Sequence, residues 1–560
     1  MTNENPELKK QQSISAAEHP KAWDPQVMIL GLPLAVVGCI IGLELIVRTG
    51  VTPNTSIIGA LFAILLSRIP VAFLRKYRSI HRQNLLQTSI SAATFSAANC
   101  MILPIGIPVI MGYPELMFPM LIGVMLATCV DATILYNCFG SEMFPAEGAW
   151  PPGVAAADSI LAVIEKGKKA VLLLVGIGLG WVGKIAGLPM DLLGVSWFGD
   201  FGAMAALAAG SLVIGVLKVN GFSFSIFGHA FNFVTNAFGE GFVYTDHLSL
   251  QYMAHGVMIG AGIISLVQCG IALFKKSKGT KTVDTTNVVS NEHMKKTLGV
   301  GFGAYLVIAL FLAVVGGIIT KMSVPQFILW LIFAAFAAEA SELIVGISAM
   351  YSGWFPGFAT ALIFLIVGML LGFPKLALGL LVGFTAATGP CFSDMAYDLK
   401  CGYILRGRGA NPELEKEGRK QQFFAELMGF AVAFVMVAFF ANKYFGQGLF
   451  VAVSNTFVAT IDAGASGEIA KWLLIWAIPG AIIQLLGGKR QLGILFATGL
   501  LVGNIINGLT IAAGLIIRLV AVRANKENEQ TLNILGAGAL AGAAIYSFFT
   551  ATLGLVGKKD

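Results

Sequence analysis

Residues 325–349 read PQFILWLIFAAFAAEASELIVGISA, and this stretch indicates the fold class of the chain. A helix needs about 20 predominantly apolar residues to cross the roughly 30 Å hydrocarbon core of a membrane. The stretch is long enough, and Glu339 and Glu342 are its only charged side chains. It therefore predicts a transmembrane helix that carries two acids.

Similar apolar runs recur along the chain, and the overall composition reflects them. Of 560 residues, 56% are hydrophobic and 12% charged, and the mean hydropathy is +0.80. Soluble domains carry about 25% charged residues, so this composition excludes a soluble enzyme, a disordered scaffold and an ordinary nucleic-acid-binding protein. The 66 glycines suit close helix packing within a membrane.

The sequence predicts an all-α, polytopic membrane protein with about sixteen transmembrane helices. Some of these helices are expected to be broken or re-entrant, and the apolar but interrupted segment 446–462 is one candidate for re-entry. The predicted spans are 27–47, 56–74, 85–110, 116–139, 169–187, 200–217, 221–239, 249–274, 298–320, 325–349, 355–373, 376–391, 421–441, 469–486, 491–517 and 531–556.

Basic residues gather in short loops, which sets the expected orientation. Cytoplasmic loops are enriched in Lys and Arg, so we assign the net charge of +7 to membrane orientation and not to nucleic-acid binding. Both termini are then expected in the cytoplasm, and we expect the plasma (inner) membrane as the location. The clusters lie at 75–82, 166–169, 275–281, 406–420 and 489–490.

The longest polar linker divides the chain into two parts of similar length. We predict a cytoplasmic N-terminal tail over 1–26, a first transmembrane half over 27–274, a cytoplasmic linker over 275–297 and a second transmembrane half over 298–560. Repeats with a substrate site at their interface are common in transporters.

The sequence lacks the common enzyme motifs. It contains no phosphate-binding G-x-x-x-x-G-K-[ST], no G-x-S-x-G and no H-E-x-x-H. The cysteines show no C-x-x-C pair, and the histidines have no metal-ligand spacing. We therefore expect no enzymatic activity, no cofactor and no resident metal, and we expect transport to be driven by an ion gradient.

Three apolar segments are interrupted by Gly and Pro, at 144–153, 346–357 and 386–394. Irregular backbone at membrane depth has to line a cavity or pack within protein, although each segment can also be an ordinary turn outside the membrane. These breaks, with a polar stripe that enters the third span, supply the expected substrate-binding residues. They are Asn84, Gln87, Glu147, Ser348, Tyr351, Ser352 and Trp354.

Acids inside apolar runs are costly and usually functional. Glu339 and Glu342 lie one helical turn apart, and two carboxylates so close in a low dielectric cannot both ionise cheaply. One of them would hold a proton, as a proton-coupling site requires, unless the pair lies in water at the end of the span. Glu44 and Asp131 are further coupling candidates, or structural hydrogen-bond partners. Asp158, Asp394 and Asp398 are expected to cap cytoplasmic helices.

Several motifs resemble the oligopeptide transporter (OPT) superfamily, which includes the yellow stripe-like transporters. Residues 398–405 read DLKCGYIL and residues 418–422 read GRKQQ, similar to the family signature D-L-K-T-G-Y-L…P-R-K-Q-Q. Residues 84–93, 144–149 and 346–353 resemble further family segments in the same order. The resemblance assigns a gating or structural role to the motif residues Asp398, Lys400, Gly402, Tyr403, Gln421 and Gln422.

The resemblance implies cation-coupled symport, usually with protons. The implied substrates are short peptides, peptide-like molecules such as glutathione, or metal-chelate complexes. We thus expect a proton-coupled symporter whose partners are a small solute, protons and the lipid bilayer, with no nucleic acid and with a homo-oligomer left open. The alternatives are a passive channel for a small polar solute and, less favoured, a membrane-embedded enzyme.

Overall fold

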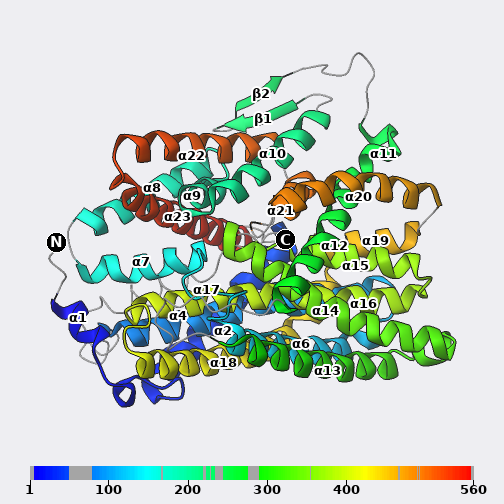
Figure 1. Cartoon of the computed structure of the whole chain (residues 1–560), viewed down its shortest axis with the longest axis horizontal. Helices are drawn as coiled ribbons and strands as arrows, with labels where there is room; N and C mark the ends of the chain where they lie inside the picture. Colours follow the sequence, from blue (N-terminus) through cyan, green and yellow to red (C-terminus); the bar gives the residue numbers. More distant parts are fainter. Residues whose placement is uncertain are drawn as a thin grey trace.

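A computed structural model of the chain is shown in Figure 1. It describes residues 6–49, 78–165, 168–218, 222–226, 229–233, 244–274, 289–353, 355–464, 467–487, 490, 492–502 and 504–556. The predicted span 56–74 lies outside these residues, as does most of the predicted linker.

The N-terminal part of the described chain contains helices and one hairpin. The elements are α1 (Pro6–Gln12), η1 (Ala16–Glu18), α2 (Pro25–Thr49), α4 (Ile80–Phe95), the π-helical η3 (Ser96–Ile102), α5 (Leu103–Ile110), η4 (Pro114–Leu116), α6 (Met117–Cys138), α7 (Pro151–Glu165), α8 (Lys168–Ile185), α9 (Met190–Phe198), α10 (Phe201–Leu217), β1 (Phe222–Ile226), β2 (His229–Phe233), η5 (Tyr244–Asp246), α11 (Leu248–Gln251) and α12 (Met253–Phe274).

In the C-terminal part, all regular elements among the described residues are helices. The elements are α13 (Asn291–Val315), η6 (Ile318–Lys321), α14 (Val324–Ser352), α15 (Gly357–Leu370), α16 (Lys375–Ala387), α17 (Pro390–Leu405), α18 (Pro412–Gly446), α19 (Ala452–Ala463), α20 (Gly467–Gly487), α21 (Leu492–Val502), α22 (Ile505–Ala524) and α23 (Asn528–Val556).

Polar caps explain where several of these helices begin. The side chains of Ser290, Ser323 and Asn411 accept hydrogen bonds from the backbone N–H three residues on, at the starts of α13, α14 and α18. Such caps satisfy N–H groups that have no partner within the helix.

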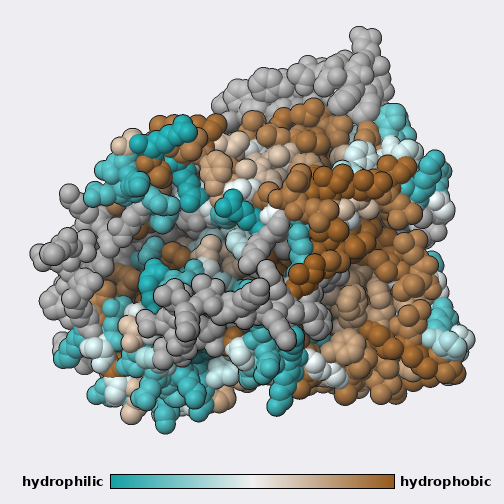
Figure 2. Space-filling view, in the orientation of Figure 1, coloured by the Kyte–Doolittle hydropathy of each residue, from teal (hydrophilic) through white to brown (hydrophobic). Residues whose placement is uncertain are grey.

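Eight helical segments among the described residues are long and apolar enough to cross a membrane, and seven shorter apolar helices accompany them. Large apolar side chains such as Val307, Phe439 and Leu486 are exposed on the outside, where lipid would cover them. Figure 2 shows hydrophobic residues over the right-hand part of this face and hydrophilic residues toward the left, near α1. These features confirm the predicted class, a polytopic helical membrane protein.

Two predicted spans are wrong in detail. Segment 221–239 contains the antiparallel hairpin β1–β2, with Phe222 opposite Phe233, because its FSFSI sequence alternates with the period of a strand. Segment 491–517 is divided between α21 and α22, which begins after the capping residue Asn504. The uncertain segment 446–462 contains the short helix α19.

Two segments form the interior. The most apolar part of α16–α17 is 100% buried and that of α4–α5 is 83% buried, whereas the corresponding share in α20 is 18%. Helices from the two predicted halves pack against each other, for example α4 on α18, α6 on α13 and α8 on α23. The division into two halves stays a prediction.

Candidate functional site

The three broken segments predicted from the sequence lie against one another. Trp150 donates its backbone N–H to the carbonyl oxygen of Met350 at 2.9 Å, joining the loop before α7 to the end of α14. The ring of Phe144 packs edge-on against that of Phe392 in α17, with 4.9 Å between the ring centroids. Gly346 permits this contact, because a Cβ there would meet both rings. The three segments thus meet within protein, but two of them are less irregular than predicted, because 346–352 forms the end of α14 and 390–394 the start of α17.

Trp150 holds a rare backbone conformation at this junction. Its φ of 39° lies in the left-handed region, which is strained for a residue other than glycine. The surroundings fix the residue: its indole N–H donates to the Pro145 carbonyl at 3.0 Å, and its ring packs near those of Phe139 and Tyr397.

Asp131 of α6 caps a different helix, α17. A Gly389–Pro390 break precedes this helix, and Gly389 has a φ of 89°. The buried Asp131 carboxylate accepts hydrogen bonds from the backbone N–H groups of Gly389 at 3.3 Å and Phe392 at 2.8 Å. A carboxylate is favoured there because the first N–H groups and the helix dipole point toward it.

Glu342 of α14 lies close enough to Asp131 for the two carboxyl groups to interact electrostatically. The Tyr305 hydroxyl of α13 donates to Glu342 Oε2 at 2.6 Å, and Glu342 Oε1 is buried without a hydrogen-bond partner among the described residues. All three side chains are fully buried. Two carboxylates so close in a low dielectric cannot both ionise cheaply, so this arrangement favours a proton on one of them.

The other predicted coupling acids are placed differently. Glu339 is partly buried and close enough to Glu342 to interact electrostatically. Its Oε2 atom is buried and accepts no hydrogen bond from the described residues. Glu44 lies in α2, and its side chain is outside the described part of the structure.

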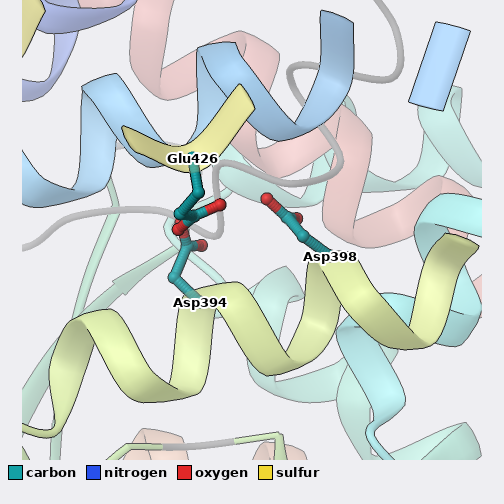
Figure 3. A group of neighbouring side chains, drawn as sticks. All are labelled: Asp394, Asp398 and Glu426. Carbon is teal, nitrogen blue, oxygen red and sulfur yellow. The ribbon is translucent and has the colours of Figure 1, made fainter. Parts of the chain in front are cut away.

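A second group of buried acids lies further along α17. The carboxylate oxygens of Asp394, Asp398 and Glu426 of α18 lie within 4.8 Å of one another (Figure 3). The Ser91 hydroxyl of α4 donates to Asp394 at 2.9 Å, and the Gln87 amide donates to Asp398. The expectation that Asp394 and Asp398 cap helices is wrong, because both lie inside α17, which begins after Gly389.

A buried polar network surrounds the end of α17. The Arg406 guanidinium pairs with Glu415 at 2.8 Å, and both side chains are 1% exposed. Arg406 also donates to Gln422 at 2.8 Å and to Asn84 at 3.4 Å. Gln422 donates in turn to the Asp398 carbonyl at 2.6 Å. Among the predicted residues, Asn84 and Gln422 therefore join α4, α17 and α18.

Gly402 and Gln421 belong to the same predicted family motif and also lie in this network or beside it. A Cβ on Gly402 would collide with side-chain atoms of Gln422 and Arg406, so glycine leaves the space that this network fills. Gln421 accepts a hydrogen bond from the backbone N–H of Ala22 at 2.9 Å, which holds the N-terminal segment against α18.

Glu147 lies in the loop before α7, where it contacts the same motif. It accepts a hydrogen bond from the Tyr403 hydroxyl at 2.8 Å and one from Arg408 at 3.3 Å. Lys400, whose side chain is 3% exposed, lies 4.0 Å from Glu147 and donates to the Ala146 carbonyl at 2.8 Å. We call Glu147, Lys400, Tyr403 and Arg408 the Glu147 clasp.

The remaining predicted substrate residues lie near the end of α14. Ser348 is buried, Tyr351 is half-buried, and the Tyr351 carbonyl accepts the backbone N–H of Asp200 at 2.8 Å. The Ser352 side chain and Trp354 are outside the described residues.

A cavity of about 260 Å³ lies apart from these groups. Its polar lining comes from Gln251, Tyr252 and His255 near the start of α12 and from Thr456 and Thr460 of α19, with apolar side chains of α15 and α20 on the other sides. The sequence analysis missed this cavity, because no local pattern brings α12, α15, α19 and α20 together.

The sequence analysis also missed Glu426, although the signal was present. It is an acid within the predicted span 421–441, the criterion by which Glu339 and Glu342 were selected. Arg406 and Glu415 were treated as loop residues, because nothing in their spacing shows that the end of α17 is buried.

Comparison with known proteins assigns a family to most of the chain. A family model described as OPT oligopeptide transporter protein matches residues 22–274 and 248–553. No curated protein matches the chain at a significant level.

Proposed function

The chain belongs to the OPT oligopeptide transporter family, and from this premise we propose that it is a proton-coupled symporter. Family membership and the apolar helices make it an integral membrane transporter of oligopeptides or similar substrates. The proposal adds the driving ion, the substrates (short peptides, peptide-like molecules or metal chelates) and a location in the plasma membrane with both termini in the cytoplasm.

The closeness of the two buried carboxyl groups of Asp131 and Glu342 carries the proposal. The pair is fully buried, and two neighbouring carboxyl groups in a low dielectric are stable together when one of them holds a proton. Loss of that proton would place two negative charges side by side in a low dielectric, which is unfavourable. The pair therefore favours a different arrangement of its helices when the proton leaves.

The two acids that share this proton belong to different helices, so its loss can move those helices relative to one another. Asp131 holds the first turn of α17 through Gly389 and Phe392, while Glu342 belongs to α14 and is held by Tyr305 of α13. A change in protonation thus acts on α6, α13, α14 and α17 together. Because the three broken segments meet at the same place, these helices have a junction about which they can shift.

We assign gating to the Glu147 clasp and solute binding to the junction of the broken segments. The clasp joins the loop before α7 to the end of α17, and its Arg408–Glu147 ion pair is exposed, so breaking that pair costs little. The junction contains Ser348 and Tyr351 of the α14 segment, two of the residues predicted to bind the solute. The cavity beside His255 offers an alternative solute site.

Uptake into liposomes tests the coupling. Purified protein is reconstituted with an inward proton gradient and a pool of di- to pentapeptides, glutathione and iron or nickel chelates, and accumulated solutes are identified by mass spectrometry. We expect gradient-dependent accumulation by the unaltered protein and its loss in Glu342→Gln, with exchange of labelled for unlabelled solute retained. Glu115→Gln, which alters an exposed acid, is the matched control and should accumulate solute normally.

The same assay separates the competing functions. Accumulation that persists without a proton gradient, or that is unchanged in Glu342→Gln, would contradict proton coupling at this pair. Solute entry without exchange of labelled for unlabelled solute would instead indicate a passive channel.

A further inference from the structure

The acids of α17 and α18 suggest a second site, distinct from the Asp131–Glu342 pair. Asp394 and Asp398 are one turn apart on α17, and Glu426 reaches them from α18 (Figure 3). Each of the three is at most 2% exposed. Oxygen atoms from three carboxylates therefore meet in a space closed to bulk water.

Glu426 provides the observation that points to a ligand. It is 0% exposed, and neither of its carboxylate oxygens accepts a hydrogen bond from the described residues. Figure 3 shows its carboxylate directed toward those of the two aspartates. A buried ionised carboxylate without a donor is strongly unfavourable, so Glu426 either holds a proton or faces a cation that the described side chains do not supply to it.

Among the described residues, the cation Arg406 near the end of α17 is already matched. Arg406 forms two hydrogen bonds with Glu415, from Nε at 2.8 Å and from Nη2 at 3.1 Å, and its remaining contacts go to Gln422 and Asn84. Two neutral groups reach the aspartates: the Ser91 hydroxyl donates to Asp394 and the Gln87 amide donates to Asp398.

The ligand set and its spacing fit a hard divalent cation. Ca²⁺ binds oxygen ligands at about 2.3–2.6 Å, so opposite ligand oxygens around one ion lie up to about 5 Å apart. The carboxylate oxygens here lie within 4.8 Å of one another. Carboxylate and hydroxyl oxygens without sulfur or imidazole favour Mg²⁺, Ca²⁺ or Mn²⁺ over softer metals.

We propose that Asp394, Asp398 and Glu426 bind a hard divalent cation, with the Ser91 hydroxyl beside it. The ion would join α17 to α18 near the network of Arg406 and Glu415. This site goes beyond the proposed symport and does not depend on it, because binding of the ion is measured without transport.

Binding of Mn²⁺ to the purified full-length chain tests the site, since free and bound Mn²⁺ differ in their electron paramagnetic resonance signal. At neutral pH we expect one Mn²⁺ per chain, displaced by an excess of Ca²⁺ or Mg²⁺. Glu426→Gln replaces a carboxylate ligand by an amide of nearly equal size. We expect the affinity of this variant for Mn²⁺ to fall roughly tenfold or more. Glu339→Gln, which alters a partly buried acid on α14, is the control and should bind Mn²⁺ as the unaltered protein does.

Three results would overturn the proposal. They are no bound Mn²⁺ in the unaltered protein, equal affinity in Glu426→Gln, or equal loss in Glu339→Gln. If Glu426→Gln does not elute as a folded protein, Asp394→Asn replaces it. Failure of proton-driven uptake would leave these binding results unaffected, so the two proposals fail separately.

Discussion

Asp131 acts as a cap supplied by another helix. Asp131→Ala would leave the backbone N–H groups of Gly389 and Phe392 without this acceptor in the interior. A buried unsatisfied donor costs about 1–3 kcal/mol, so we expect a loss of stability of about 2–4 kcal/mol. The measurement is the thermal unfolding midpoint of the purified protein.

Two further variants make this prediction specific. Asp131→Asn keeps an acceptor oxygen and should lower the midpoint less than Asp131→Ala. Thr133→Val changes an exposed hydroxyl on the same helix and should leave the midpoint nearly unchanged. Equal midpoints for Asp131→Ala and the unaltered protein would contradict the capping role.

His19 gives the N-terminal segment a pH dependence. Burial, followed by electrostatic interactions with His81 and Arg406, lowers the pKa of His19 from 6.5 to about 3. A released His19 therefore binds a proton more readily than a docked one. Stabilisation of the docked segment is complete above about pH 6.5 and is lost progressively as the pH falls toward 3.

Hydrogen exchange of residues 16–24, corrected for intrinsic exchange rates, measures this effect. We expect less protection at mildly acidic than at neutral pH, and we expect His19→Gln to weaken the difference. Protection that does not change with pH in the unaltered protein would show that His19 does not control docking.

At the scale of single residues, the sequence identified which acids matter better than it identified the residues that they contact. It singled out Glu342 and Asp131 because an acid in an apolar run is costly, but it paired Glu342 with Glu339, its neighbour on the helix. The structure instead brings Asp131 to Glu342 from α6. A contact between distant helices leaves no local spacing to detect.

Between elements, Gly402 sets how closely α17 approaches its neighbours. In Gly402→Ala the added methyl group would meet side-chain atoms of Gln422, Arg406 and Asn84. Overpacking of this kind costs about 1–3 kcal/mol. We expect a lower thermal midpoint and, because the buried Arg406–Glu415 pair would be displaced, poorer expression of the folded protein.

Gly303→Ala is the matched control in α13, where a Cβ would meet nothing within 4 Å. Alanine is favoured over glycine inside a helix by about 0.5–1 kcal/mol, so this variant should be as stable as the unaltered protein or slightly more stable. A destabilisation of equal size in both variants would refute the role of close packing at Gly402.

Helices were predicted well where the apolar run is long, and elements were predicted poorly where it is short. The apolar runs that became α6, α13, α14 and α18 are long enough to allow no other reading. The hairpin β1–β2 was mistaken for a span because its phenylalanines made it apolar, although they alternate with serine along β1. The Gly-Pro breaks were recognised, but their mutual contact was not, since Gly346 meets Phe144 and Phe392 only in the folded chain.

At the scale of the whole molecule, charged residues lie at both ends of the long helices. The start of α18 at Pro412 follows the basic stretch 406–408, and Gln421 binds the N-terminal segment at Ala22. At the opposite end of the same helices, α16 begins at Lys375, which pairs with Asp462 near the end of α19. The path Lys375–Leu405 contains 31 residues, about 46 Å of helix, which suffices to cross a membrane once.

This arrangement predicts which residues face the cytoplasm. Positive residues favour the cytoplasmic side, so Lys416 should lie inside and Asp462 outside; both are exposed. In intact cells, a membrane-impermeant maleimide should label Asp462→Cys and not Lys416→Cys, whereas permeabilised cells should show both. The unaltered chain supplies the background, which should be low because Cys39, Cys100, Cys138, Cys391 and Cys401 are buried. Labelling of Lys416→Cys alone in intact cells would invert the orientation and place both the Glu147 clasp and the N-terminal segment on the outer side.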